Sequence, residues 1–73
     1  MIYKIEAKFY DEDASQPQID TYYAFLKKYS AAGIAHRGTR TSSINIETKK
    51  SLTRKILEQD LVGIEILSFK KLH

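Results

Sequence analysis

The chain of 73 residues has no cysteine, one proline and three glycines. Without cysteine, neither a disulfide nor a thiolate metal site can stabilise it. No apolar run approaches the roughly 20 residues that cross a bilayer, and Lys4, Glu6 and Lys8 interrupt the first run, unlike the apolar stretch of a signal peptide. We expect a single cytoplasmic domain over residues 1–73, with no membrane contact and one small core.

Charge is distributed unevenly along the chain. The formal net charge is +3, but residues 1–26 hold two basic and five acidic side chains, whereas residues 27–56 hold eight basic and one acidic. This asymmetry is typical of a surface that faces a polyanion.

The first half of the chain predicts a strand followed by a helix. Residues 2–10 alternate in polarity, with Tyr3, Ile5, Ala7 and Phe9 on one face. Helical spacing follows a capping box of Ser15 and Gln18, and Gly33 is expected just after the helix end. The apolar positions of this helix are Ile19, Tyr22, Tyr23, Leu26 and Tyr29, with Phe25 at the margin.

The second half predicts a hairpin, a helix and a last strand. Residues 34–47 form two short strands around a turn near Gly38, Thr48 or Ser51 caps the second helix, and mixed facing predicts a last strand that is bulged or covered on both sides. The order is β-α-β-β-α-β, which resembles the ferredoxin-like arrangement. We therefore expect an α+β fold with a four-stranded antiparallel sheet and two helices on one face.

This topology brings three lysine pairs to one edge. The end of the first helix, the start of the second helix and the end of the last strand would meet there, carrying Lys27, Lys28, Lys49, Lys50, Lys70 and Lys71. Lysines at the start of a helix would favour a bound anion, because free backbone N–H groups point outward there. Solvated surface lysines are the alternative interpretation.

The opposite edge carries charges of both signs. Arg37 and Arg40 in the hairpin turn could contact phosphates. Alternatively, they pair with Asp11–Asp13 and Asp60, which we expect on the same edge.

The aromatic first helix offers a second binding surface. Phe25 and Tyr29 extend the apolar arc beyond what a two-helix layer needs, so they are candidates for a protein interface as well as for the core.

Residues suited to catalysis are few. His36 has no partner at ligand spacing, and His73 is the last residue. Asp11 and Asp13 follow the first strand, a placement similar to that of the aspartate in small ferredoxin-like CRISPR nucleases, which implies metal-dependent cleavage. A solvated acidic loop is the competing interpretation. We expect no enzyme activity, no catalytic residue, no metal and no cofactor.

We therefore expect a non-catalytic regulatory binding module. Its lysine-rich edge would contact a nucleic-acid backbone or another acidic partner. One alternative is an inhibitor or adaptor that binds another protein. An example would be a phage-type counter-defence protein that blocks a nucleic-acid enzyme. The other is a metal-dependent nuclease using Asp11 and Asp13. Two edge strands also permit a homodimer.

Overall fold

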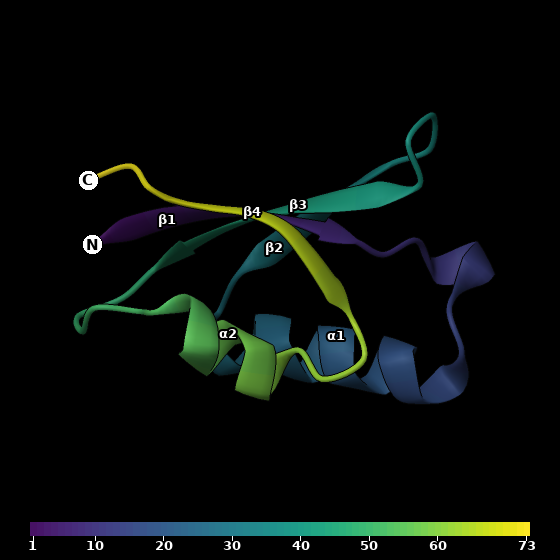
Figure 1. Cartoon of the computed structure of the whole chain (residues 1–73), viewed down its shortest axis with the longest axis horizontal. Coiled ribbons are helices and arrows are strands. Elements are labelled where there is room, and N and C mark those ends of the chain that lie inside the picture. Colours follow the sequence, from purple (N-terminus) through teal and green to yellow (C-terminus); the bar gives the residue numbers. More distant parts are fainter.

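The computed structural model describes residues 1–73 as a sheet covered by helices. The elements are β1 (Ile2–Lys8), a single 3₁₀ turn η1 (Asp11–Asp13), α1 (Gln16–Lys28), β2 (Ala32–His36), β3 (Thr41–Glu47), α2 (Arg54–Asp60) and β4 (Glu65–Lys71). The sheet order is β2-β3-β1-β4, and every neighbouring pair is antiparallel. Figure 1 shows both helices on one face, leaving the other face open. The expected α+β class, with a four-stranded antiparallel sheet and two helices, is confirmed.

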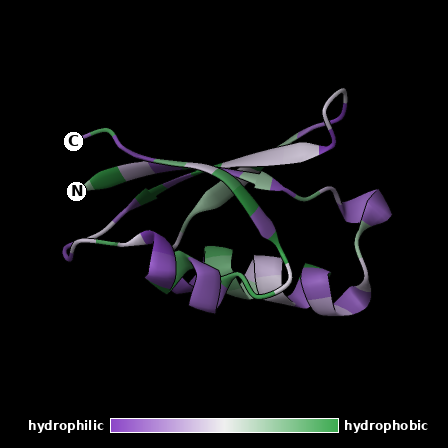
Figure 2. Ribbon diagram, in the orientation of Figure 1, coloured by the Kyte–Doolittle hydropathy of each residue, from purple (hydrophilic) through white to green (hydrophobic).

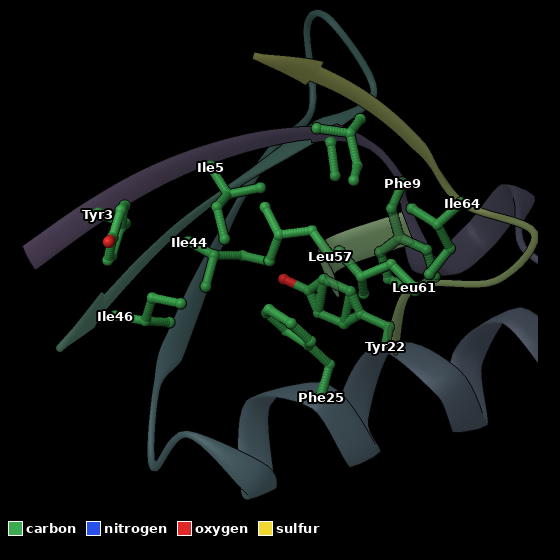
Figure 3. Packing of buried hydrophobic residues seen from close by; sticks show 12 residues of the cluster. Tyr3, Ile5, Phe9, Tyr22, Phe25, Ile44, Ile46, Leu57, Leu61 and Ile64 are labelled. Carbon is green, nitrogen blue, oxygen red and sulfur yellow. The ribbon is translucent and has the colours of Figure 1, made fainter. Parts of the chain in front are cut away.

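The alternation predicted for β1 places its apolar side chains under the helices. Tyr3, Ile5, Ala7 and Phe9 are all at most 3% exposed, and they belong to one hydrophobic cluster (Figure 3). Regular pairing ends at Lys8, two residues before the alternation does. The other buried members of the cluster come from the two helices, the other strands and the α2–β4 connection: Tyr22, Phe25, Ile44, Ile46, Leu57, Leu61, Ile64 and Ile66.

The predicted capping of α1 is confirmed. The Ser15 backbone N–H donates to Gln18 Oε1 at 3.0 Å, and Pro17 occupies the first turn, where its missing N–H is not needed.

The predicted role of Gly33 as the stop of α1 is wrong. The helix ends at Lys28, and Ser30 adopts the left-handed conformation with φ of +50°. The Ala31 N–H then bonds back to the Leu26 carbonyl at 2.8 Å, which closes the helix end without a glycine. Gly33 lies inside β2, opposite Ile44.

The buried arc of α1 differs from the predicted one at two positions. Phe25, placed at the margin, is 2% exposed, whereas Tyr23 is 49% exposed and donates from its hydroxyl to Asp11 Oδ2 at 2.7 Å. Figure 3 shows Phe25 pointing from α1 toward the sheet. Because two helices share one face, the arc is centred on Tyr22 and Phe25.

The predicted hairpin and the predicted irregularity of the last strand are confirmed. Residues 37–40 form the turn between β2 and β3, and Arg40 takes a φ of +55°. On β4, the register against β1 shifts between Glu6 and Ala7, because Glu6 pairs with Ser68 and Ala7 with Ile66. Leu67 is the extra residue of this bulge.

The second helix starts later than predicted. Thr53, rather than Thr48 or Ser51, is the cap, and its hydroxyl accepts a hydrogen bond from the Ile56 N–H at 3.3 Å. Residues 48–53 therefore form a separate connecting segment, and the predicted position of Lys49 and Lys50 at a helix N-terminus is wrong.

Candidate functional site

Six lysines lie at one end of the molecule, which we call the lysine end: Lys27, Lys28, Lys49, Lys50, Lys70 and Lys71. The connecting segment 48–53 and both chain termini lie together there, at the left of Figure 1. The Thr48 N–H donates to the Met1 carbonyl at 2.8 Å, and Lys71 pairs with Tyr3 in the sheet. The β3–α2 turn at this end is hydrophilic (Figure 2).

Three of these lysines surround one cavity. It has a volume of about 480 Å³ and lies between the end of α1 and the connecting segment. Its lining includes Lys28, Lys49 and Lys50 together with the hydroxyl side chains of Tyr29, Ser30, Thr48 and Ser51, and it also includes one acid, Glu47. The ammonium groups of Lys49 and Lys50 can donate hydrogen bonds to an anion there, whereas the hydroxyls of Tyr29, Thr48 and Ser51 already donate to Asp60, the Lys50 carbonyl and the Met1 sulfur.

The connecting segment is anchored at both ends. Met1 and Thr48 form two hydrogen bonds: the Met1 amino group donates to the Thr48 carbonyl at 2.8 Å, and the Thr48 N–H donates to the Met1 carbonyl at 2.8 Å. At the other end, the Leu52 N–H donates to the Tyr3 hydroxyl at 3.0 Å. Within the turn, the Thr48 hydroxyl donates to the Lys50 carbonyl at 2.6 Å. The backbone carrying Lys49 and Lys50 is therefore held in place before any ligand arrives.

Lys28 differs from the other five lysines because it has an acidic partner. Its ammonium group lies 3.0 Å from Asp60 Oδ2, and this hydrogen bond raises the pKa of Lys28 above its usual value. The Tyr29 hydroxyl donates to the same carboxylate at 3.1 Å, while burial raises the pKa of Tyr29. Lys28 therefore stays charged but is partly neutralised.

Unpaired positive charge is concentrated at the lysine end. All three arginines of the chain lie within 4 Å of a carboxylate: Arg37 with Glu12, Arg40 with Asp13 and Arg54 with Glu58. Five of the six lysines at the lysine end have no such partner: Lys27, Lys49, Lys50, Lys70 and Lys71.

The hairpin end has the opposite character. Arg40 contacts Asp13 at 2.7 Å, and Arg37 lies 3.8 Å from Glu12, so both arginines face the acids of η1. The pKa of Arg40 is raised by the hydrogen bond to Asp13. Since these guanidinium groups already have partners, this end offers less free charge to a phosphate.

Asp60 does not lie at the hairpin end, where the sequence placed it. A helix of seven residues advances only about 10 Å at about 1.5 Å per residue. Asp60 therefore ends beside Lys28 and Tyr29 at the end of α1.

Sequence reasoning missed that Lys4 lies beside one of the lysines of the lysine end. The register places Lys4 of β1 directly opposite Lys70 of β4, and Lys4 lies 3.6 Å from Glu6. Like charges directly opposite each other in a sheet repel. Only the register brings the two lysines together, so no local pattern could have identified them.

A row of polar side chains crosses the open face of the sheet and was also missed. The Ser43 hydroxyl on β3 donates to Glu6 Oε2 on β1 at 2.7 Å, and it lies 2.8 Å from His36 Nε2 on β2. Ser68 on β4 is directly opposite Glu6. A cavity of about 690 Å³ adjoins this row, lined by Glu6, His36, Gly38, Thr39, Thr41, Leu67 and Ser68.

The order of this row does not suit nucleophilic catalysis of the Ser-His-acid type. There the histidine stands between the serine and the acid, whereas here Ser43 stands between Glu6 and His36. Ser43 is also only 8% exposed. The row instead joins three strands through side chains.

Replacing Ser43 by alanine tests this structural role. We expect the free energy of unfolding to fall by about 1–2 kcal/mol, because the half-buried Glu6 carboxylate loses its hydroxyl donor. Urea unfolding would measure the change. Ser68→Ala is the matched control, since Ser68 flanks Glu6 on the other side without a side-chain hydrogen bond, and should cost about 0.5 kcal/mol or less. Equal losses in both variants would contradict the role of Ser43.

The two candidates for a protein interface separate in the structure. Phe25 is buried and packs against Tyr29 with ring centroids 5.0 Å apart, so its predicted interface role is wrong. Tyr29 is partly buried and lines the cavity at the lysine end. Phe25 was misplaced because α1 buries a narrower arc than its aromatic content indicates.

The acidic candidates for metal binding are held by other side chains. Asp11 accepts the Tyr23 hydroxyl and Asp13 accepts the Arg40 guanidinium. No three histidine or carboxylate side chains gather where they could hold a metal ion. None of the helices is both long and apolar enough to cross a membrane.

Comparison of the chain with models of protein families, with curated proteins and with solved structures finds no match.

Proposed function

We propose that the protein is a non-catalytic module that binds the phosphate backbone of a nucleic acid through its lysine end. The observation that carries this proposal is the gathering of unpaired lysines around an anchored turn and a cavity, in a chain whose arginines are all paired with acids. Lys49 and Lys50 lie in that turn and line the cavity, and Lys27, Lys70 and Lys71 belong to elements that end at the same end of the molecule. An acidic stretch of a protein is the competing ligand.

The open face supports contacts to the backbone rather than to stacked bases. Proteins that bind single strands on a sheet stack bases on aromatic side chains of the central strands. Here the outward residues of β1 and β3 include no aromatic ring: Ile2, Lys4, Glu6, Lys8, Thr41, Ser43, Asn45 and Glu47. Binding is therefore expected to depend steeply on salt and weakly on sequence.

The carboxylates favour a binding module over a nuclease. Asp11 and Asp13, the residues best placed for metal-dependent cleavage, are engaged by Tyr23 and Arg40.

The strand order, the antiparallel pairing and the two helices on one face support a ferredoxin-like arrangement. In this arrangement β3 and β4 run in the same direction, so both strands finish at the same end of the sheet.

A charge-neutralising pair of variants tests the proposal. Lys49→Gln/Lys50→Gln lowers the formal net charge from +3 to +1, and so does Arg37→Gln/Arg40→Gln at the opposite end. Fluorescence anisotropy with labelled DNA and RNA at a series of salt concentrations would measure the dissociation constant. We expect the lysine variant to reduce the slope of log K against log salt by about 2, because two phosphate contacts are lost.

The arginine variant is the matched control and should retain most of the affinity. Equal losses in both variants would show that only net charge matters, and would contradict a localised site. Absence of binding to either nucleic acid at low salt would overturn the proposal. Salt-sensitive capture of polyglutamate without capture of nucleic acid would assign the lysine end to acidic proteins instead.

A further inference from the structure

The strand β2 forms one free edge of the sheet. It pairs only with β3, so every second residue turns its backbone N–H and C=O away from the molecule. Four of its five residues are exposed, and Ile34, a large aliphatic side chain, is 58% exposed. The sequence of this edge is Ala-Gly-Ile-Ala-His, without an acid, a lysine, an arginine or a proline.

The two edges of the sheet differ in how they prevent pairing. Natural edge strands are protected by charged side chains, by prolines or by bulges. On β4 the structure has a bulge at Leu67 and two lysines, Lys70 and Lys71. On β2 the register against β3 is continuous over all five residues, and no protecting feature is present. The edge at β2 is therefore open to another strand.

We propose that β2 pairs antiparallel with β2 of a second copy of this chain, which would join the two sheets into one of eight strands. This pairing is self-complementary about Ile34, as a twofold interface requires. Ile34 would then lie opposite Ile34 of the second copy, Gly33 opposite Ala35, and Ala32 opposite His36. The paired segment brings no two charged side chains together.

The charged residues next to β2 favour antiparallel over parallel pairing with a second copy. Arg37 follows the strand, and antiparallel pairing about Ile34 sets it opposite Ala31 of the second copy, whereas parallel pairing would set two Arg37 side chains against each other. Antiparallel pairing also keeps the two lysine ends at opposite ends of the joined sheet, because β2 starts near the lysine end and runs to the hairpin turn. Strands of acidic or basic partners would lack any matching charge on β2.

A pair of lysine substitutions distinguishes the two edges. Ile34→Lys and Leu67→Lys each add one positive charge at an exposed aliphatic residue, the first on β2 and the second on β4. The mass of the wild-type chain and of both variants would be measured by sedimentation equilibrium from micromolar to millimolar protein at physiological salt. We expect the wild type and Leu67→Lys to approach twice the monomer mass of 8.4 kDa, and Ile34→Lys to remain a monomer.

The outcomes are separable from folding and from ligand binding. Circular dichroism of Ile34→Lys should match the wild type, since the side chain is exposed; if that variant is unfolded, Ala35→Lys at the same edge provides the same test. A wild-type chain that stays monomeric at millimolar concentration overturns the inference. Loss of the dimer in Leu67→Lys but not in Ile34→Lys would assign the interface to β4 and would also overturn it.

Discussion

Replacement of Phe25 by alanine is expected to lower the free energy of unfolding by about 3–5 kcal/mol, the usual cost of deleting a buried aromatic ring. Phe25 is 2% exposed and lies where α1 meets the sheet. A chain of 73 residues has a total stability of about 4–11 kcal/mol at the typical stability per residue. We therefore expect Phe25→Ala to lose a large part of its stability, seen as a much lower urea midpoint in a titration monitored by circular dichroism at 25 °C.

Tyr23→Ala is the matched control on the same helix. Tyr23 is 49% exposed, and its contacts are an edge-to-face packing on Tyr22 and the hydrogen bond to Asp11. Its removal should cost about 1 kcal/mol or less. If Tyr23→Ala cost as much as Phe25→Ala, the burial of Phe25 in place of Tyr23 on α1 would be wrong.

Replacement of Gly33 by alanine is the second substitution with a large expected effect. A Cβ atom built on Gly33 would overlap the Tyr22 hydroxyl oxygen and would lie 2.9 Å from the ring carbon that carries it. Tyr22 is 4% exposed and stacks on Phe9 with ring centroids 4.0 Å apart, so it has little room to move. We expect Gly33→Ala to lower the free energy of unfolding by about 1–3 kcal/mol through overpacking.

Two further variants test whether the cost of Gly33→Ala comes from contact with the Tyr22 hydroxyl. Gly38→Ala should be neutral or stabilising by up to about 1 kcal/mol, because nothing lies within 4 Å of its Cβ position and alanine restricts the unfolded chain. In a Tyr22→Phe background, Gly33→Ala should cost less, since the overlapping oxygen is gone. Equal costs in the two backgrounds, measured as a double-mutant cycle by urea unfolding, would show that the hydroxyl is not the obstacle.

Gly33 illustrates how sequence reasoning missed a packing constraint. A glycine five residues after Lys28 is well placed to stop a helix, and that was the prediction. Ser30 performs this role by adopting a positive φ, and Gly33 is required instead because Tyr22 approaches β2 closely. The close approach joins residues of two elements, so only their packing reveals it.

The candidate site was partly predictable. Strand directions follow from the order of elements, so the gathering of Lys49 and Lys50 with the end of α1 and the end of β4 could be anticipated. The sequence pattern alone could not decide where the second helix begins, because Thr48, Ser51 and Thr53 can all cap a helix. The choice among them depends on hydrogen bonds to distant residues. The Thr48 N–H donates to the Met1 carbonyl, and the Leu52 N–H donates to the Tyr3 hydroxyl. These two hydrogen bonds join residues 48–52 to β1 instead of to α2.

The sequence by itself determined the alternation of β1, the start of α1, the hairpin, the order of the elements and the excess of basic side chains over residues 27–56. These features depend on neighbours within a few residues, or on chain order. Tertiary structure alone decided the Glu6–Ser43–His36 row and the unprotected edge at β2. Each of these depends on register and on residues up to 37 positions apart, as Ser43 and Glu6 are, and such contacts leave no local pattern.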